Sequence, residues 1–143
     1  MKCINGEDSI VYRNDVALAG EDLKELYDDA GWVAYTKDLP CLLEAIEHSL
    51  LVITAWDRDR LVGMIRIVGD GRSILYIQDI LVLSTYRRSR IGTNLVKQVL
   101  AEFNTVRQKV LLTDDTPQIR AFYESLGFFS CDRGELVAFV KFG

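Results

Sequence analysis

The 143 residues are enough for one domain with a substantial core, and a content of 49 % hydrophobic and 27 % charged residues is ordinary for a soluble globular protein. The formal net charge of −4 argues against general affinity for nucleic acid, and no stretch approaches the roughly 20 apolar residues that a membrane span needs. Because the N-terminal residues also lack the apolar run of a signal peptide, we expect a cytoplasmic protein with neither nucleic acid nor membrane as a partner.

Metal chemistry has little support in this composition. The three cysteines, Cys3, Cys41 and Cys131, are widely scattered and form neither a CxxC pair nor a disulfide framework. The single histidine, His48, has no second histidine or nearby cysteine with which to share a metal ion. We therefore expect no metal cofactor and no catalysis based on histidine.

The first fifty residues predict one strand followed by two helices. Residues 10–16 are typical of a strand, and residues 21–30 carry apolar side chains at helical spacing. Glu21 and Asp22 stand at the start of this helix, where acidic side chains suit the helix dipole. A second helix is expected to begin at residues 38–40, because the proline there is well tolerated in a first helical turn.

Residues 51–56, 61–68 and 74–83 predict three consecutive strands. A charged loop at residues 57–60 separates the first two, and a glycine-containing turn at residues 69–71 separates the second from the third. Short connections of this kind suit an antiparallel meander.

The residues after this meander predict a binding site. A turn at residues 84–86 leads into the basic tetrapeptide 87–90, and an amphipathic helix follows from Ile91. The first N–H groups of a helix have no intrahelical partner, and the helix dipole favours negative charge at that end. Three arginines at this place are unfavourable unless an anion is present. We therefore expect the loop to bind a phosphorylated ligand.

The last third of the chain predicts a short strand, a helix and two closing strands. The strand occupies residues 110–112, and the helix begins with Thr116 as its N-cap and ends at Gly127. The closing strands occupy residues 128–129 and 136–142.

The element order β-α-α-β-β-β-α-β-α-β-β predicts an α/β fold with a mixed sheet, in a single domain over residues 1–143. The sheet is expected to be mixed because the later β-α-β steps need crossovers and therefore parallel neighbours.

Two local patterns lie in a fixed order between residues 51 and 129. The first matches Gln/Arg-x-x-Gly-x-Gly/Ala, present here as Arg87-Arg88-Ser89-Arg90-Ile91-Gly92 after the apolar segment Ile80-Leu81-Val82. The second is a Phe-Tyr-x-x-x-Gly-Phe run, present as residues 122–128. Separated by one helix and one strand, the two patterns resemble those of the GNAT N-acetyltransferase superfamily.

The resemblance implies transfer of acetyl from acetyl-CoA to an amine, by direct attack in a ternary complex. In the family, the strand that matches Ile80, Leu81 and Val82 splays from its neighbour and binds the pantetheine arm through its backbone. The loop that binds the pyrophosphate matches Arg87, Arg88, Ser89, Arg90, Ile91, Gly92 and Thr93. The family tyrosine that matches Tyr123 protonates the departing thiolate, a suitable role for a phenol because it is still protonated at neutral pH.

The chain departs from the family pattern in two places. Arg90 replaces the first motif glycine, and Arg88 also stands where glycine is frequent, although glycine permits close approach of the backbone to a phosphate. An arginine at position 90 can still hold a helical backbone, with its side chain either supplementing the backbone amides or folded outward. Thr116 occupies the place of a frequent family asparagine at the start of the last helix, so that contact with the cofactor is not carried over.

Asp79 is the candidate general base or amine anchor. A carboxylate in an otherwise apolar strand must be exposed, paired or functional, and pairing with Arg66 of the neighbouring strand is the alternative. By simple alternation Tyr76 lies on the other face of the strand and could line the cleft instead. Trp32 and Tyr35 either close over the substrate or pack in the core.

These observations predict an acetyl-CoA-dependent N-acetyltransferase for a small-molecule amine, whose proton passes to Asp79 or to water. The acidic net charge suits a cationic amine. A non-catalytic CoA-binding or regulatory module is one alternative, favoured by Arg90, and acetylation of a peptide or protein amine is another. A different enzyme with a phosphorylated ligand such as ATP is a third. A homodimer through the apolar residues 136–140 is the expected assembly.

Overall fold

The protein is represented by a computed structural model in which residues 9–143 are described, so Cys3 lies outside the described residues. The chain divides into two compact units with a boundary between Leu112 and Thr113. The expectation of one domain over residues 1–143 stays a prediction, and the two units are described separately.

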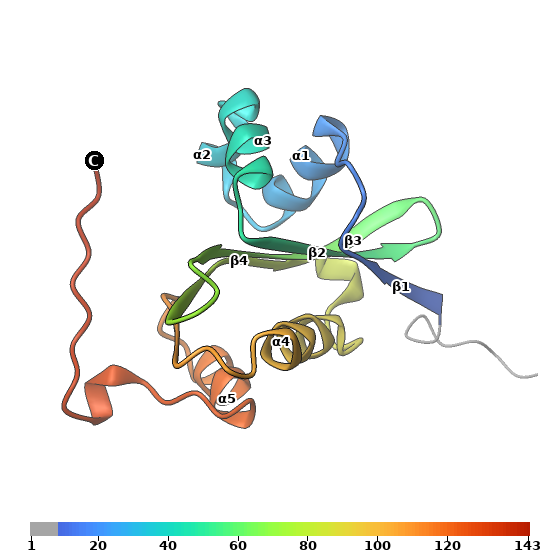
Figure 1. Cartoon of the computed structure of the whole chain (residues 1–143). Helices are drawn as coiled ribbons and strands as arrows, with labels where there is room; N and C mark the ends of the chain where they lie inside the picture. Colours follow the sequence, from blue (N-terminus) through green and yellow to red (C-terminus); the bar gives the residue numbers. More distant parts are fainter. Residues whose placement is uncertain (1–8) are drawn as a thin grey trace, which may run out of the picture. The chain divides into compact units, whose positions relative to one another are not determined.

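The first unit contains the sheet (Figure 1). Among the described residues, five strands pair in the order β1 (Ile10–Arg13), β2 (Leu51–Asp57), β3 (Arg60–Gly69), β4 (Ile74–Val82) and β5 (Gln108–Leu111). The strands β1 to β4 are antiparallel neighbours, whereas β5 runs parallel to β4. The predicted meander and the mixed α/β fold class are therefore confirmed.

One face of the sheet is covered by α1 (Gly20–Asp29), α2 (Val33–Thr36) and α3 (Leu39–Glu47), and the other by α4 (Ile91–Glu102), as Figure 1 shows. The acidic first turn of α1 and the start of α3 follow the prediction. Asp38 caps α3 by accepting a hydrogen bond from the backbone N–H of Cys41 at 3.2 Å. The short helix α2 was not predicted, because four residues are too few to show a helical period.

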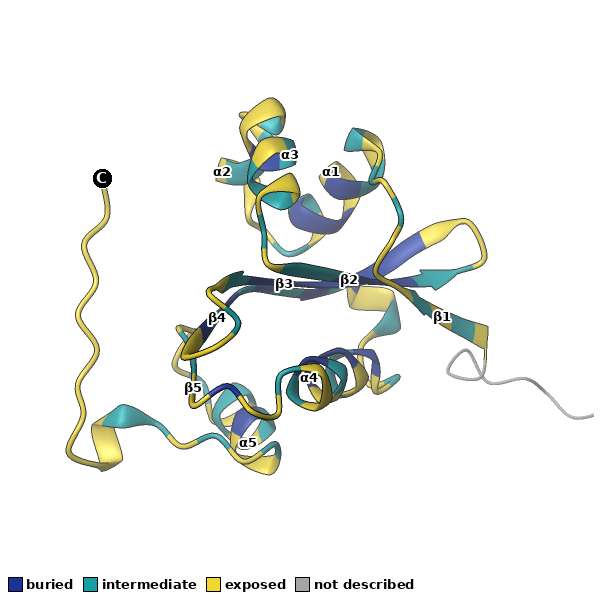
Figure 2. Ribbon diagram, in the orientation of Figure 1, coloured by how far each residue is buried: buried dark blue, intermediate teal, exposed yellow. Residues whose placement is uncertain are grey.

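The core lies between the sheet and these helices. Its largest fully buried side chains come from α1, the strands and α4, and they include Leu23, Met64, Ile67 and Leu95. Figure 2 shows the buried residues in the central strands and on parts of α1 and α4. None of the helices in residues 9–143 is both long and apolar enough to cross a membrane.

A β-bulge divides β4 into two halves. The register passes from the Ile67–Ile77 pair to the Arg66–Asp79 pair, which leaves Gln78 as an extra residue in β4. The bulge lies at the point where the pairing of β4 with β5 also ends, because β5 pairs only as far as Ile77.

The bulge places Tyr76 and Asp79 on the same face of the sheet. Tyr76 pairs with Val68 and Asp79 with Arg66, and these two partners share a face because they are two residues apart in a regular part of β3. The prediction that Tyr76 lies on the opposite face from Asp79 is therefore wrong. It assumed simple alternation, which the extra residue breaks.

The second unit contains α5 (Pro117–Ser125), whose start and end were predicted correctly. The Thr116 hydroxyl accepts a hydrogen bond from the backbone N–H of Ile119 at 3.2 Å, and proline stands in the first turn. Just after the helix, Gly127 adopts a φ of +93°, in the left-handed region that glycine enters without strain.

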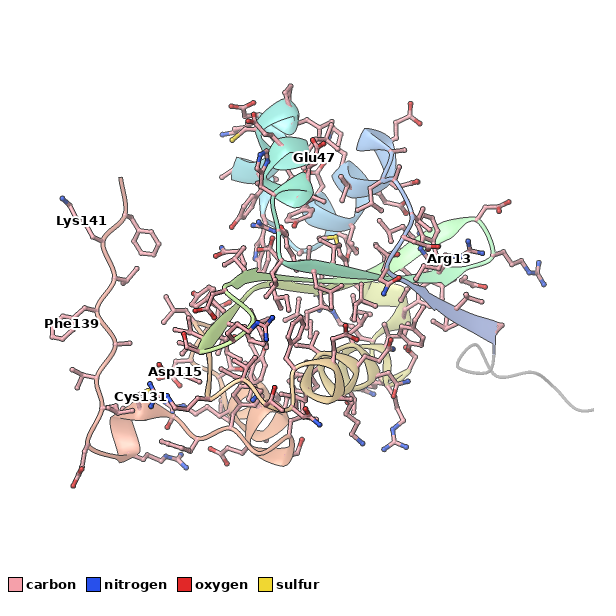
Figure 3. The ribbon with its side chains drawn as sticks, in the orientation of Figure 1. Arg13, Glu47, Asp115, Cys131, Phe139 and Lys141 are labelled. Carbon is pink, nitrogen blue, oxygen red and sulfur yellow. The ribbon has the colours of Figure 1, made fainter. Side chains whose placement is uncertain are left out.

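The two predicted closing strands are absent from the described chain. Residues 131–133 form a short 3-10 helix, and residues 134–143 have neither helix nor strand (Figure 3). Their composition is that of strands, but an isolated strand has no hydrogen bonds of its own and needs a neighbour. No described strand pairs with these residues, so propensity alone does not order them.

Candidate functional site

The C-terminal half of β4 has an open edge. β5 pairs with β4 only over Ile74–Ile77, and residues 78–82 have no strand partner on that side among the described residues. On the other side β3 continues to pair with β4 as far as Val82, opposite Gly63. Backbone groups that point toward the open side are therefore free to pair with an extended ligand, as a further strand would.

The segment after this edge is tied to the sheet and to α1. The Leu83 N–H donates to the carbonyl of Val62 at 2.9 Å, and residues 84–86 form a 3-10 turn. The carboxylate of Asp29 accepts hydrogen bonds from the Ser84 hydroxyl and the Ser84 N–H, at 2.8 Å each. These bonds stabilise the ionised form and lower the pKa of Asp29.

Sequence reasoning missed the role of Asp29. The sequence does contain one indication of this role. Asp29 stands in the last turn of a helix, where a negative charge is unfavourable unless a hydrogen-bond donor pairs with it. The Tyr86 hydroxyl donates to Asp57 at the end of β2, a contact with no comparable sign in the sequence. The loop is thus held at its start and its middle before the arginines begin.

Arg88 and Arg90 hold left-handed backbone conformations, with φ values of +69° and +65°. Arg90 is the N-cap of α4, so the expectation of a helical backbone at this residue is wrong. Such a conformation costs roughly 1–2 kcal/mol in a residue with a Cβ, and glycine adopts it freely. The chain therefore keeps the backbone shape of the glycine motif although arginine replaces glycine at positions 88 and 90.

The basic loop lies at an uncapped helix start. Arg87, Arg88 and Arg90 are exposed, and their side chains make no hydrogen bond or ion pair with any residue of the described chain. The N-cap residue supplies no side-chain cap, and the first turn of α4 contains no acidic residue. Positive side chains and unsatisfied N–H groups therefore meet at one place, which suits an anion.

Gly63 fixes the start of α4 close to the sheet. A Cβ at this position would lie 2.8 Å from Cγ2 of Ile91 and 3.2 Å from the carbonyl oxygen of Leu81. Ile91 is itself buried, so any side chain at position 63 would push the first turn of α4 away from β4. The open strand edge and the helix start are thereby kept together.

Asp79 is buried in an ion pair on the opposite face of the sheet from α4. Its Oδ2 accepts hydrogen bonds from Nε of Arg66 and from the hydroxyl of Tyr27, both at 2.7 Å, and the residue is 1 % exposed. Burial and the neighbouring carboxylate raise the pKa of Tyr27. Burial opposes the charge of Arg66, but the hydrogen bond to Asp79 and the attraction of Asp79 and Tyr27 together outweigh it and raise the pKa of Arg66. The predicted pairing with Arg66 is present.

The other oxygen of this carboxylate, Oδ1 of Asp79, is buried and has no hydrogen-bond partner among the described residues. An ionised oxygen without a partner is unfavourable in a protein interior, where buried polar atoms are nearly always bonded. Asp79 thus combines a structural ion pair with one unused acceptor.

Three aromatic rings lie beside this carboxylate. The ring of Tyr27 lies 5.2 Å from that of Tyr35 and 6.2 Å from that of Trp32, measured between centroids. The Tyr35 hydroxyl accepts a hydrogen bond from Nε2 of Gln78 at 3.2 Å. Trp32 is 36 % exposed, so the cluster runs from the buried carboxylate toward solvent.

Tyr123 belongs to α5 in the second unit and is 8 % exposed. Its ring packs edge-on against Phe122 and Phe128, with centroids 4.9 Å and 5.8 Å away. Burial raises the pKa of Tyr123 to about 12. The phenol is therefore protonated throughout the neutral range, as a proton donor must be.

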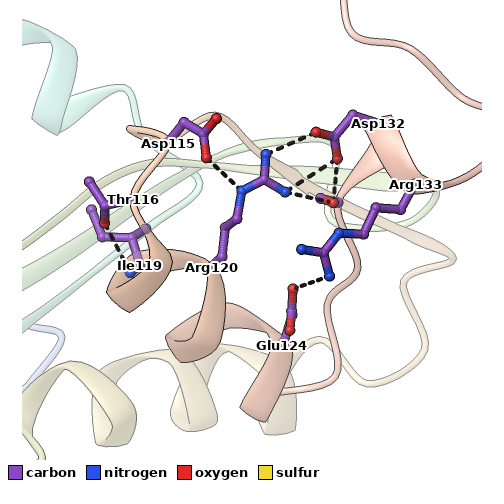
Figure 4. Close-up of polar contacts among 8 residues, drawn as sticks. Asp115, Thr116, Ile119, Arg120, Glu124, Asp132 and Arg133 are labelled. Atoms are coloured by element: carbon purple, nitrogen blue, oxygen red, sulfur yellow. Dashed lines mark hydrogen bonds and ion pairs between the residues drawn. The ribbon is translucent and has the colours of Figure 1, made fainter.

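The segment around α5 is held by ion pairs (Figure 4). Arg120 donates to Asp115 at 2.6 Å and to Asp132 at 2.9 Å, and it also bonds the hydroxyl of Ser130 at 3.1 Å. These contacts fix the residues that follow the helix against its first turns. All of these contacts lie within the second unit.

The buried phenol predicts a loss of stability at high pH. The folded pKa of Tyr123 is raised from 10.0 to about 12, so its stabilising effect is complete below pH 10 and is lost as the pH rises toward 12. Denaturant unfolding at pH 8 and pH 11 should show a decrease of about 1 kcal/mol from this residue. Tyr123→Phe should lack this component, and an equal decrease in the variant would contradict it.

The described residues contain no group of three or more His, Cys, Asp or Glu side chains placed to hold a metal ion. Cys41 is exposed and Cys131 partly exposed, and both are free thiols.

An open edge of the mixed sheet that leads into a basic, uncapped helix start is suited to an extended ligand that carries phosphate groups. A family model for the acetyltransferase (GNAT) domain matches residues 19–142. The chain therefore belongs to the GNAT acetyltransferase family.

Solved structures and curated sequences agree with this assignment. A GNAT-family acetyltransferase from Streptococcus pneumoniae TIGR4 is 34 % identical with a TM-score of 0.84, over 94 % of this chain and 98 % of that one. A probable acetyltransferase from meticillin-resistant Staphylococcus aureus is 25 % identical with a TM-score of 0.69, over 93 % and 99 %. An uncharacterized ycf52-like N-acetyltransferase from Prochlorococcus marinus is 27 % identical, over 96 % of this chain and 79 % of its own length.

Proposed function

We propose that the protein transfers acetyl from acetyl-CoA to the nitrogen of a small amine, by direct attack in a ternary complex. The observation that carries the proposal is the open edge of β4 at residues 78–82, which leads directly into three unpaired arginines at the start of α4. An extended amide-containing arm fits the strand edge, and a pyrophosphate fits the helix start.

The cofactor side of the site follows from these two features. Backbone groups of Ile80, Leu81 and Val82 would pair with the pantetheine arm. The N–H groups of Ser89 and of Ile91, Gly92 and Thr93 in the first turn of α4 would bind the pyrophosphate. The side chains of Arg87, Arg88 and Arg90 would add charge-assisted hydrogen bonds, which are roughly twice as strong as neutral ones.

In the proposed reaction the amine nitrogen bonds to the acetyl carbon while the carbon–sulfur bond breaks. A backbone N–H near Val82 would stabilise the negative charge on the carbonyl oxygen. Tyr123 would give its proton to the departing thiolate, the role of the matching family tyrosine, and its raised pKa keeps that proton available at neutral pH. The amine loses its own proton to Asp79 or to water.

On the amine side, Asp79 has one carboxylate oxygen that could accept a hydrogen bond or a proton from the amine. Its Oδ2 is engaged by Arg66 and Tyr27, so an amine or its proton would meet Oδ1. The aromatic rings of Tyr27, Trp32 and Tyr35 would line the approach, and aromatic faces attract cationic groups. A small cationic amine therefore fits this side better than a neutral one.

Thermal unfolding with added nucleotide tests the cofactor site directly. Acetyl-CoA at about one hundred times its dissociation constant should stabilise the protein by about 2.7 kcal/mol, and ATP at the same concentration should stabilise it less. Arg87→Ala should weaken the shift, whereas Arg58→Ala, an exposed arginine of the β2–β3 turn, should not. A larger shift with ATP would favour a different phosphate-binding enzyme.

Arg90→Gly should separate backbone shape from side-chain charge. Glycine relieves the left-handed strain, so the free energy of unfolding should rise by up to about 1 kcal/mol. Arg58→Gly is the matched control, because Arg58 has a φ of +56° and lies in another loop. If the Arg90 side chain binds the pyrophosphate, only Arg90→Gly should weaken acetyl-CoA binding, by about tenfold. Unchanged affinity in both variants would contradict this role.

A non-catalytic CoA-binding module is the second candidate, and the arginines in the glycine positions favour it. It predicts a thermal shift with acetyl-CoA but no acetyl transfer to any amine. Tyr123→Phe would then have no activity to reduce. The two candidates therefore differ in turnover and agree in binding.

A further inference from the structure

A cavity of about 630 Å³ lies between the β1–β2 side of the sheet and the C-terminal half of α4. Its strand side contains Tyr12 of β1 with Leu51 and Ile53 of β2. Its helix side contains Gln98 and Glu102, which lie one turn apart on α4. The volume is that of a small-molecule site, for which roughly 300–1,000 Å³ is usual. The whole cavity belongs to the first unit.

This cavity is separate from both parts of the candidate site. Ile53 pairs with Ile65 of β3, whereas the next residue of β3, Arg66, pairs with Asp79. Because successive residues of a strand point to opposite faces, Ile53 and Asp79 lie on opposite faces of the sheet. The basic loop precedes the first turn of α4, and Gln98 lies about 10 Å farther along that helix.

Charged side chains of both signs line the cavity. Arg13 supplies a guanidinium group, and Asp15 and Glu102 supply carboxylates. Within residues 9–143, none of these three side chains forms a hydrogen bond or an ion pair with another residue. Opposite charges that surround one cavity without pairing with each other are available to a ligand that carries both signs.

Glu102 gives an independent reason to expect a cation in this cavity. It is the last residue of α4, and the last turn of α4 contains no basic residue. The C-terminal end of a helix carries partial negative charge, so a carboxylate there is unfavourable unless a cation lies near it. Asp15 adds a second negative charge to the same cavity. One guanidinium and two carboxylates therefore suit a ligand with one anionic and two cationic groups.

We propose that the cavity is a second ligand site that binds a basic amino acid. The carboxylate of the ligand pairs with the guanidinium of Arg13, in the planar geometry that suits these two groups. The α-ammonium and the side-chain cation pair with Asp15 and Glu102. The aliphatic stem of the ligand lies against the apolar side chains of Leu51 and Ile53. This inference does not depend on the proposed acetyl transfer.

Calorimetric titration with L-lysine, in the absence of acetyl-CoA, is the first test. We expect a dissociation constant of about 1 mM or lower. L-Norleucine lacks the side-chain cation and cadaverine lacks the carboxylate, so each should bind at least about tenfold more weakly than L-lysine. No binding of L-lysine at about 10 mM, or an affinity for either analogue equal to that for L-lysine, would overturn the proposal.

Substitution of the charged residues is the second test. Arg13→Gln and Glu102→Gln should each raise the dissociation constant of L-lysine at least about tenfold. Glu47→Gln is the matched control for the carboxylate, because Glu47 is exposed and is the last residue of α3. Arg58→Gln, in the exposed β2–β3 turn, is the control for the guanidinium. Unchanged affinity in the two cavity variants, or an equal loss in the controls, would contradict the assignment.

Nuclear magnetic resonance of the isotopically labelled protein would locate the bound amino acid. L-Lysine should shift the backbone amide signals of residues 12–15, 51–53 and 98–102, and it should leave those of residues 79–82 and 87–93 in place. Shifts confined to residues 79–82 or 87–93 would place L-lysine in the acetyl-transfer site and refute a second ligand site.

Discussion

Tyr123→Phe is expected to lower kcat for acetyl transfer by at least about 100-fold, the usual contribution of a positioned general acid. The KM for acetyl-CoA should change little, because the substitution removes a proton and not a surface that binds the carrier. The physical basis is the buried phenol, whose pKa of about 12 keeps it protonated at every pH at which an enzyme of this kind works.

Steady-state kinetics with free-thiol detection would measure this effect. Tyr12→Phe is the matched control, because Tyr12 is a tyrosine of β1 whose hydroxyl accepts a hydrogen bond from Asn94 at 3.1 Å. Equal kcat values for the Tyr123 variant and the wild type would assign the thiolate proton to another donor, such as water.

Asp79→Leu is expected to lower the free energy of unfolding by about 3–5 kcal/mol. The substitution leaves the guanidinium of Arg66 buried without its counter-ion, and it also removes the acceptor of the Tyr27 hydroxyl. A loss of this size is a large fraction of the total stability of a small domain. Denaturant unfolding monitored by circular dichroism would measure it.

The triple variant Tyr27→Phe, Arg66→Met, Asp79→Leu is the control for this prediction. It removes the ion pair and its hydrogen-bond partner together, so no buried polar group is left unpaired, and most of the stability should return. A triple variant as unstable as Asp79→Leu would show that shape and packing, and not the unpaired charge, cause the loss.

The role of Asp79 in catalysis needs a milder change. Asp79→Asn keeps the shape of the side chain and removes its charge. If Oδ1 receives the amine proton, kcat/KM should fall and its dependence on pH should change in the folded variant. A fall in stability with an unchanged pH profile would leave Asp79 as a structural ion pair and assign the proton to water.

The sequence predicted the parts of the fold that local patterns determine. The meander of β2 to β4 follows from apolar runs with short charged or glycine-containing turns, and the start of α5 follows from Thr116 and Pro117. The basic loop was also placed correctly before α4. Each of these features depends on residues that are neighbours in the chain.

The features that escaped prediction depend on distant residues. The bulge at Gln78 arises from pairing between two strands and leaves no mark in the composition of either. The bond from Tyr27 to Asp79 joins residues far apart in sequence. The left-handed backbone of Arg90 was missed because a residue with a Cβ rarely adopts it, and only the matching glycine of the family pointed to it.

The predicted closing strands show a different limit. Residues 136–142 have the composition of a strand, but a strand exists only where another strand offers its hydrogen bonds. The composition therefore indicates that the segment can form a strand, but it does not indicate whether a partner strand is available.

Acetyl transfer over a panel of small amines, followed by the release of free thiol from acetyl-CoA, tests the central claim most directly. We predict turnover that requires both acetyl-CoA and an amine, that is strongest with a cationic amine, and that Tyr123→Phe abolishes almost completely. No thiol release with any amine, together with no thermal shift by acetyl-CoA, would contradict both the enzyme and the binding site from which it is inferred.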